Sequence, residues 1–189
     1  MIQHQLLAGK RGVIFGALDE SSIAWHVATQ CVAEGAKITL TNAPVAMRFG
    51  TIQQLGEKLN AEVISADATS TEELTALFQK SVEILGGPLD FVLHSIGMSL
   101  NVRKGKTYTD INHEWMHKTL DISAMSFHRM MQVLYQTDSM ADGGSILALT
   151  YIAALRRLVH KHYLNKQMSM TVTGADKLLL VNILNTIVR

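Results

Sequence analysis

The residues best suited to chemistry follow short apolar segments, and the first of them form a glycine turn. This turn runs from Gly16 to Ile23 and reads GALDESSI. A glycine directly after a strand lets the backbone turn tightly, and a helix that begins near Ser22 presents free N–H groups at its positive end. The segment can therefore bind a phosphate-sized anion. The common G-x-G-x-x-G fingerprint is absent, so an ordinary β–α turn stays open as the alternative.

Two later segments could contact the rest of a nucleotide. Asp67, in the segment ADAT, could accept a hydrogen bond from an adenine amino group, although on its own it fits a turn aspartate better. The tetrapeptide His94-Ser95-Ile96-Gly97 follows another apolar run, and its small residues would let a flat ligand approach the backbone.

A tyrosine and a histidine pair complete the candidates. Tyr151 follows the apolar run SILALT, and a phenol there could donate a proton or a hydrogen bond to a developing oxyanion, but a lone tyrosine is more often a surface residue. The segment His113 to His117 matches H-E-x-x-H, the pattern of zinc hydrolases, with His128 nearby. Since the chain has 8 histidines and no clear third ligand, we favour a solvated helix start and predict no metal site.

These candidates need elements that hold them at one edge of a sheet. Short β-branched runs predict five strands, and helical periodicity predicts helices between them. The expected strands are 12–15, 37–41, 62–66, 91–94 and 145–150, and the expected helices are 22–34, 45–59, 71–85, 110–118 and 122–135. Such alternation predicts a doubly wound parallel sheet, a Rossmann-like three-layer αβα fold of the α/β class.

Local patterns refine these elements. Ile23, Val27 and Cys31 recur at helical spacing and predict the apolar stripe of the first helix, and Gly35 fits the helix end. Gly143-Gly144 predicts a turn before the fifth strand.

Composition limits the remaining classes of protein. The 189 residues are 48% apolar with a net charge of +1, which fits about one globular domain and gives no charge excess for nucleic acid or a membrane surface. A single cysteine favours a reducing compartment. We find neither a signal peptide nor an apolar stretch that could span a membrane, so we expect a cytoplasmic protein.

The pattern changes near Arg156. We expect a dinucleotide-binding domain over residues 1–156 and a divergent tail over 157–189 that forms no domain of its own, which leaves the sheet incomplete on its C-terminal side. A reading-frame change or a damaged gene is the simplest hypothesis for the tail, and a genuine shortened homologue is the alternative.

Five segments together resemble one enzyme family. They read GKRGVIFGALDESSIAW, EKLNAEVISADAT, LDFVLHSIGMS, KTLDISAMSFHRMMQV and GSILALTYIAALR. Their content and order are similar to the NADH-dependent enoyl-[acyl-carrier-protein] reductases of bacterial fatty-acid synthesis, within the short-chain dehydrogenase/reductase superfamily, and especially to the variant of Bacteroides-like bacteria. The resemblance spans Leu6 to about Arg156.

The resemblance implies roles for individual residues. The pyrophosphate and ribose turn matches Gly16, Ala17, Ser22 and Ile23; the adenine pocket matches Asp67 and Ala68; the segment next to the nicotinamide and its ribose matches Ser95, Ile96 and Gly97. The segment Thr41 to Pro44 offers no acidic residue for the adenosine ribose, so NADH is implied by the family alone.

The catalytic pattern is matched only in part. Tyr151 matches the first of the family's two active-site tyrosines, but Lys161 and Met168 stand where the second tyrosine and the lysine belong. Tyr163 and Lys166 are possible substitutes, at a different spacing. The resemblance implies hydride reduction of an enoyl-acyl-carrier-protein double bond by a homotetramer. The alternatives are a catalytically inactive NAD-binding remnant or interaction module, and a short-chain reductase with a rearranged site.

Overall fold

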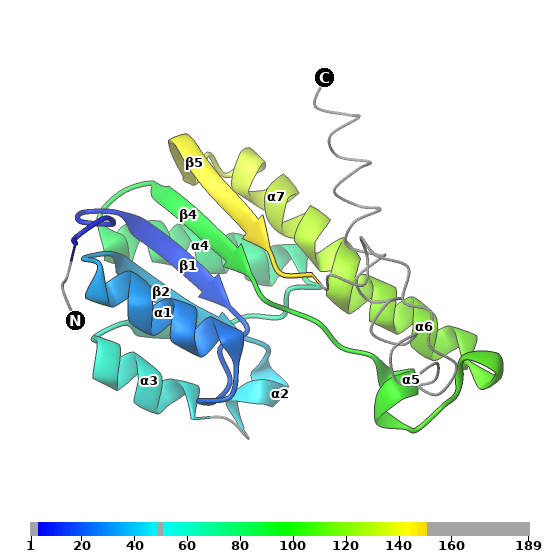
Figure 1. Cartoon of the computed structure of the whole chain (residues 1–189). Coiled ribbons are helices and arrows are strands. Elements are labelled where there is room, and N and C mark those ends of the chain that lie inside the picture. The colour runs from blue at the N-terminus through cyan, green and yellow to red at the C-terminus, as the bar shows by residue number, and fades with distance from the viewer. Residues whose placement is uncertain (1–3, 49–50, 151–189) are drawn as a thin grey trace. The chain divides into compact units, whose positions relative to one another are not determined.

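The computed structural model describes residues 4–48 and 51–150. It contains a sheet of five parallel strands in the order β3-β2-β1-β4-β5 (Figure 1). The strands are β1 (Arg11–Phe15), β2 (Lys37–Asn42), β3 (Glu62–Ser65), β4 (Leu89–His94) and β5 (Met140–Ala148). This order reverses direction between β1 and β4, and in doubly wound sheets ligands bind beyond the carboxyl ends of the strands at such a reversal.

The described residues form two compact units. The unit that contains the sheet comprises residues 4–48, 51–95 and 129–148, and the second contains residues 96–128 and 149–150. The expected boundary at Arg156 lies outside the described residues. The expected α/β class and the doubly wound parallel sheet are confirmed in the first unit.

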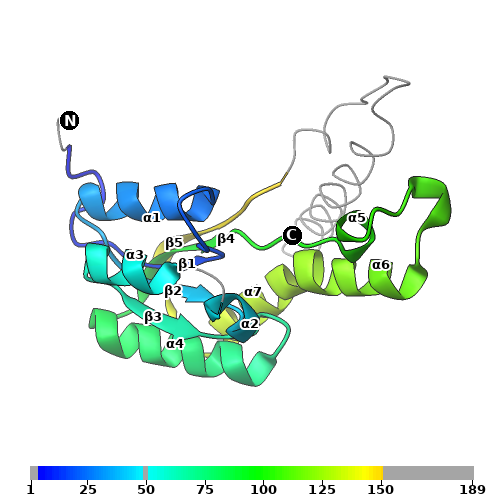
Figure 2. The same cartoon turned by 90° about the horizontal axis from the view of Figure 1, so that it is seen from below.

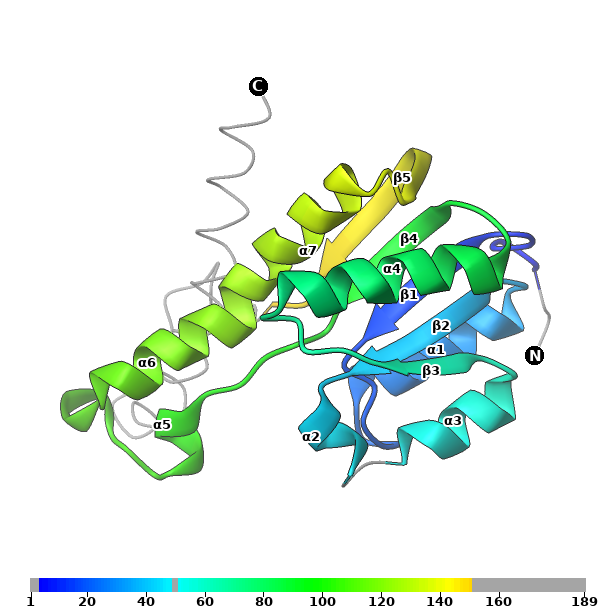
Figure 3. The ribbon, with the colours of Figure 1, turned by 180° about the vertical axis from the view of Figure 1, so that it is seen from behind.

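Helices cover both faces of the sheet, as parallel strands require. The helices α1 (Ile23–Ala33) and α3 (Ile52–Leu59) lie on one face, while α4 (Thr71–Leu85) lies on the other (Figures 2 and 3). The C-terminal part of α7 (Ser126–Gln136) lies on the same face as α4 (Figure 3). These three layers are the expected αβα arrangement.

The core is centred on the two middle strands. Val13 and Ile14 of β1 are completely buried, and so is Val92 of β4. The ring of Phe15 lies 6.0 Å from that of Phe78 of α4, which ties the sheet to this helix. Each such side chain contributes roughly 1.5–3 kcal/mol on burial, so this cluster gives the carboxyl edge of the sheet a rigid base.

The helix α4 begins and ends where its sequence predicts. The hydroxyl of Ser70 accepts a hydrogen bond from the backbone N–H of Glu73, and the acidic Glu72 and Glu73 lie in the first turn. The serine satisfies one free N–H group of the helix, and the two carboxylates interact favourably with the helix dipole. The helix ends at Gly86, whose φ of 77° is left-handed.

The second unit is made of short helices. They are α5 (Leu100–Arg103), the 3₁₀ turn η1 (Tyr108–Asp110), α6 (His113–Leu120) and the π-helical turn η2 (Asp121–Met125), which leads into α7. Asn101 holds the intervening loop, because its side chain donates to the carbonyl oxygen of Asn112 and accepts from its backbone N–H.

Three local predictions are wrong. The expected helix over 45–59 is two helices, α2 (Pro44–Met47) and α3. Gly143-Gly144 lies within β5, which starts at Met140, and it is not a turn before that strand. Ile23 is 63% exposed, while the buried residues of α1 are Ala24, Trp25 and Ala28.

The strand β3 is less buried than is usual for a parallel strand, which is commonly covered on both faces. It is at one edge of the described sheet, and its first and last residues, Glu62 and Ser65, are exposed. Among the described residues, no helix combines the length and the apolar character needed to span a membrane.

Candidate dinucleotide site

The candidate site is built around the contact between the carboxyl ends of β1 and β4. Gly16 follows β1 directly and has a φ of 88°. A Cβ atom at this position would overlap the backbone carbonyl oxygen of Ser95, which follows β4. Only glycine therefore fits, because the backbone is left-handed here and because the segments after β1 and β4 approach each other closely.

The turn after Gly16 is fixed by its own serines. The hydroxyl of Ser22 donates to the carbonyl oxygen of Asp19 (2.7 Å) and accepts from the backbone N–H of Leu18 (3.2 Å). It consequently does not cap α1, although Ser22 is the N-cap residue, and the first turn of α1 contains no acidic side chain. The N–H of Trp25 donates to the carbonyl oxygen of Ser22 (3.1 Å), while the N–H groups of Ile23 and Ala24 are left available to an anion.

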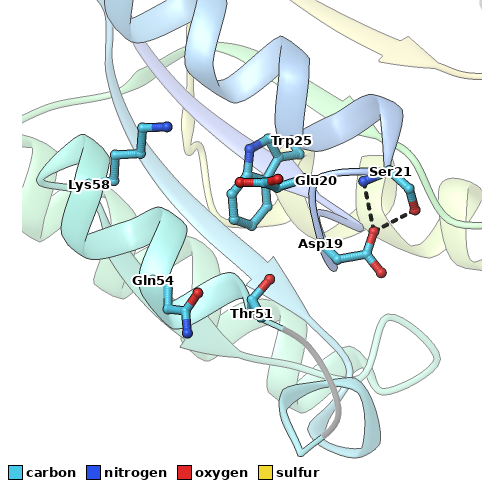
Figure 4. Close-up of a pocket in the computed structure, with 7 residues that line it drawn as sticks. All are labelled: Asp19, Glu20, Ser21, Trp25, Thr51, Gln54 and Lys58. Carbon is cyan, nitrogen blue, oxygen red and sulfur yellow. Dashed lines mark hydrogen bonds between the residues drawn. The ribbon is translucent and has the colours of Figure 1, made fainter.

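Asp19 is satisfied within the same turn. Its carboxylate accepts from the hydroxyl of Ser21 (2.6 Å) and from the backbone N–H of Ser21 (2.9 Å) (Figure 4). These bonds lower the pKa of Asp19 below its ordinary value of 3.8, and the bond from the Ser21 hydroxyl has the largest effect. This side chain is therefore ionised at neutral pH.

The end of β2 supports the same turn from the other side. Asn42 donates from Nδ2 to the carbonyl oxygen of Ala17 (3.0 Å), which is fully buried, and its Oδ1 accepts from the backbone N–H of Ala43 (2.9 Å). The backbone N–H of Gly16 donates to the carbonyl oxygen of Thr41 (3.0 Å). Sequence reasoning noted only that Asn42 is not acidic and missed this contact.

Asp67 lies in a loop that is held from both sides. Its Oδ1 accepts from the backbone N–H and from the hydroxyl of Thr69 (both 2.8 Å), while its own N–H donates to Glu73 Oε2 (2.8 Å). Among the described residues, Asp67 Oδ2 receives no hydrogen bond, so one carboxylate oxygen can accept from a ligand. Ala68, next in the chain, is buried and makes a small apolar wall.

The structure brings most of the predicted residues to one edge of the sheet unit. Gly16, Ala17, Ser22, Ile23, Asp67, Ala68 and Ser95 all follow the carboxyl ends of its strands or begin its helices. Ile96 and Gly97 belong to the second unit. Tyr151, Tyr163 and Lys166 lie outside the described residues, as do Lys161 and Met168.

A surface depression on the outer side of this turn was not predicted. Its volume is about 480 Å³, and it lies between the β1–α1 turn and α3 (Figure 4). The lining residues are Asp19, Glu20, Ser21, Trp25, Thr51, Gln54 and Lys58. Its charges have both signs, and no motif in the sequence marks it.

The histidine pair does not form a metal centre in the described part of the chain. His113, Glu114 and His117 lie on exposed positions of α6, whose N-cap is Asn112. Within residues 4–48 and 51–150, no group of three or more His, Cys, Asp or Glu side chains is arranged to hold a metal ion.

The fold and this edge define a Rossmann-like α/β protein with a candidate dinucleotide site, and comparisons with known proteins give its family. A family model described as enoyl-(acyl carrier protein) reductase matches residues 16–171, so the match continues past Arg156. The chain belongs to this family.

Individual relatives agree with the family match. The chain is 36% identical over 157 residues to enoyl-[acyl-carrier-protein] reductase [NADH] 1 of Rhizobium meliloti, which covers 82% of this chain and 56% of the relative. It is 31% identical over 152 residues to the reductase [NADH] FabI of Rickettsia felis, with 79% and 56% covered. The chain thus spans little more than half the length of these curated relatives.

Solved structures resemble this chain more closely. The crystal structure of FabI from Alistipes finegoldii is 52% identical, with a TM-score of 0.84, and the match covers 95% of this chain and 65% of that one. The FabI–NADH complex from the same organism is also 52% identical, with a TM-score of 0.85 and coverage of 95% and 60%.

Proposed function

We propose that this chain carries the dinucleotide-binding part of an NADH-dependent enoyl-[acyl-carrier-protein] reductase. The observation that carries the proposal is the contact of Gly16 with Ser95 at the reversal of strand order, a place that only glycine can occupy. The similarity to the FabI–NADH complex of Alistipes finegoldii supports the choice of NADH.

The residues fit the adenosine and pyrophosphate parts of this cofactor. Gly16 and Ala17 would let the pyrophosphate approach the backbone, and the N–H of Ile23 would donate to it. The N–H of Ser22 donates to the carbonyl oxygen of Asp19 (3.0 Å), so Ser22 would support the turn. Asp67 would accept from the adenine amino group through Oδ2. Bound NADH supplies a hydride to the β-carbon of the substrate.

The remaining roles follow the resemblance. Ser95, Ile96 and Gly97 would adjoin the nicotinamide and its ribose, and Tyr151 would lie in the substrate pocket. The substrate would be a trans-2-enoyl thioester on acyl carrier protein, in fatty-acid synthesis. The proposal includes a tetramer in the cytoplasm, and a domain over residues 1–156 followed by a tail without a domain of its own.

One observation favours a second function, an NAD-binding module without catalysis. Lys161 and Met168 stand where the family has its second tyrosine and its lysine. Without a phenol to hydrogen-bond the developing enolate oxygen, hydride transfer would lose several kcal/mol of oxyanion stabilisation.

Two measurements on the 189-residue chain separate these functions. NADH binding is followed by fluorescence, and turnover by loss of NADH absorbance with crotonyl-coenzyme A. The reductase is supported if Tyr151→Phe abolishes turnover and Tyr135→Phe leaves it unchanged. Tyr135 is the control because it is 89% exposed on α7. Binding without turnover supports the inactive module. If the chain neither binds nor oxidises NADH, both proposals are wrong.

A further inference from the structure

The side chain of Asn42 joins two of the segments that would hold the adenosine half of a dinucleotide. Asn42 is the last residue of β2 and half-buried. Its Nδ2 donates to the carbonyl oxygen of Ala17, and its Oδ1 accepts from the N–H of Ala43. These two bonds, the Asn42 bridge, fix the orientation of the amide, since an exchanged nitrogen and oxygen would satisfy neither partner.

The backbone of Asn42 extends the connection to a third strand. Its carbonyl oxygen accepts from the N–H of Ala66 (3.1 Å), the residue before Asp67. On the other side, Thr41 accepts from the N–H of Gly16. The end of β2 is therefore bonded to the turn after β1 and to the loop after β3.

The bridge gives this position a different role from the one it has in many dinucleotide-binding folds. There, an acidic residue near the end of the second strand accepts a hydrogen bond from the adenosine ribose. Here both polar atoms of the Asn42 side chain are already bonded within the protein. A carboxylate would place an oxygen against the carbonyl of Ala17 and add a negative charge beside the expected pyrophosphate turn.

We propose that Asn42 is a positioning residue for the cofactor: it contacts no part of the ligand and holds the Gly16–Leu18 turn in the conformation that accepts the pyrophosphate. The inference rests on the proposed function for the identity of the ligand. The bridge itself is tested without any ligand.

The variant Asn42→Asp tests the bridge with the smallest change in shape. It keeps an acceptor for the N–H of Ala43, removes the donor to Ala17 and adds a negative charge. We expect the dissociation constants of NADH and ADP to rise about tenfold or more, the equivalent of ~1.4 kcal/mol. The constant for adenosine, which lacks phosphate, should change by less than about threefold. Asn42→Ala, which adds no charge, should also raise the dissociation constant of ADP.

Amide hydrogen exchange supplies the readout that a general loss of stability would not give. In both variants, exchange at Gly16 and Leu18 should become faster, while Ile14, Leu40 and Leu93 in the strands keep their protection. Gln53→Ala, which removes an exposed amide from α3, should change neither binding nor exchange.

Each result decides the inference. The inference is overturned if amide exchange in the turn stays as in the wild type, or if adenosine and ADP lose affinity equally. A uniform loss of protection in all strands would also overturn it. If the wild-type chain binds no NADH, the proposed function fails, whereas faster exchange confined to the turn would still establish the bridge.

Discussion

The hydroxyl of Ser123 makes two hydrogen bonds to one residue, Met98. It donates to the carbonyl oxygen of Met98 (3.1 Å) and accepts from its backbone N–H (3.0 Å). Ser123 is completely buried in the π-helical turn η2, and Met98 directly follows the Ile96-Gly97 segment. The π-helical turns of proteins are rare and often occur at functional sites. This one directs the Ser123 hydroxyl at the backbone of the loop.

Removal of this hydroxyl should destabilise the second unit. Ser123→Ala leaves the backbone N–H and carbonyl of the half-buried Met98 without this partner, at a cost of about 1–3 kcal/mol in the free energy of unfolding. Urea denaturation measures the change. Thr75→Ala is the control, since the Thr75 hydroxyl is exposed and bonds only to a carbonyl within α4, so its loss should cost less than about 0.5 kcal/mol. Equal costs for the two variants would contradict the assignment.

Two glycines separate backbone strain from steric overlap. Gly16 and Gly86 have left-handed φ values of 88° and 77°, but a Cβ would meet the Ser95 carbonyl at Gly16 and nothing within 4 Å at Gly86. Alanine should cost about 1–2 kcal/mol at Gly86, from strain alone. At Gly16 the overlap adds to this, so we expect about 3 kcal/mol or more.

Chemical denaturation of both glycine variants gives the difference, and NADH binding gives the functional effect. Gly16→Ala should also lose NADH binding, because the turn must move to admit the new Cβ, whereas Gly86→Ala should retain it. Similar losses of stability at the two positions would show that the approach of Gly16 to Ser95 is not tight.

The fold was predictable where local pattern and tertiary packing agree. The helix α4 has a serine cap, acidic first-turn residues and a terminal glycine, and its bounds match the prediction. The pattern failed where packing decides. At Gly143, with a φ of 73°, β5 continues through a glycine pair beside a shift in its register with β4. Such an irregularity in a strand depends on the neighbouring strand, which local sequence does not specify.

The candidate site was predictable as a set of strand ends, but its contacts were not. Strand alternation places Gly16, Asp67 and Ser95 at the same edge of a parallel sheet. The overlap at Gly16 depends on β4 lying beside β1, and the Asn42 bridge depends on the turn returning over β2. Both follow from the order of strands, which is a property of the whole sheet.

Asp90 should make stability depend on pH in the acidic range. Its carboxylate accepts from Lys10 Nζ (2.7 Å) and from the backbone N–H of Arg11 (2.9 Å), and the bond from Lys10 is the main reason that its pKa lies below the ordinary value of 3.8. A lowered pKa in the folded state stabilises the fold above the unfolded pKa. This stabilisation is lost as pH falls from about 4 through the folded pKa.

The comparison of wild type with Asp90→Asn isolates this contribution. Urea denaturation should show the wild type more stable at neutral pH, with the difference shrinking as pH falls below about 4. Glu62→Gln is the control, because Glu62 and Lys80 are 3.9 Å apart and both 53% exposed, so their pairing contributes little. A difference that is constant over this pH range would rule out the carboxylate as its source.

Asp67 should recognise adenine without being needed for the fold. In Asp67→Asn, the amide oxygen can still accept both bonds from Thr69, but an NH₂ group replaces the free Oδ2 acceptor. A donor then faces the adenine amino group, so binding of NADH and ADP should weaken about tenfold, or ~1.4 kcal/mol. Calorimetry should show no change for nicotinamide mononucleotide, which has no adenine, and Asp142→Asn on an exposed position of β5 should bind all three ligands like wild type. Unchanged ADP affinity in Asp67→Asn would remove this residue from the site, because its free Oδ2 is the acceptor that the variant takes away.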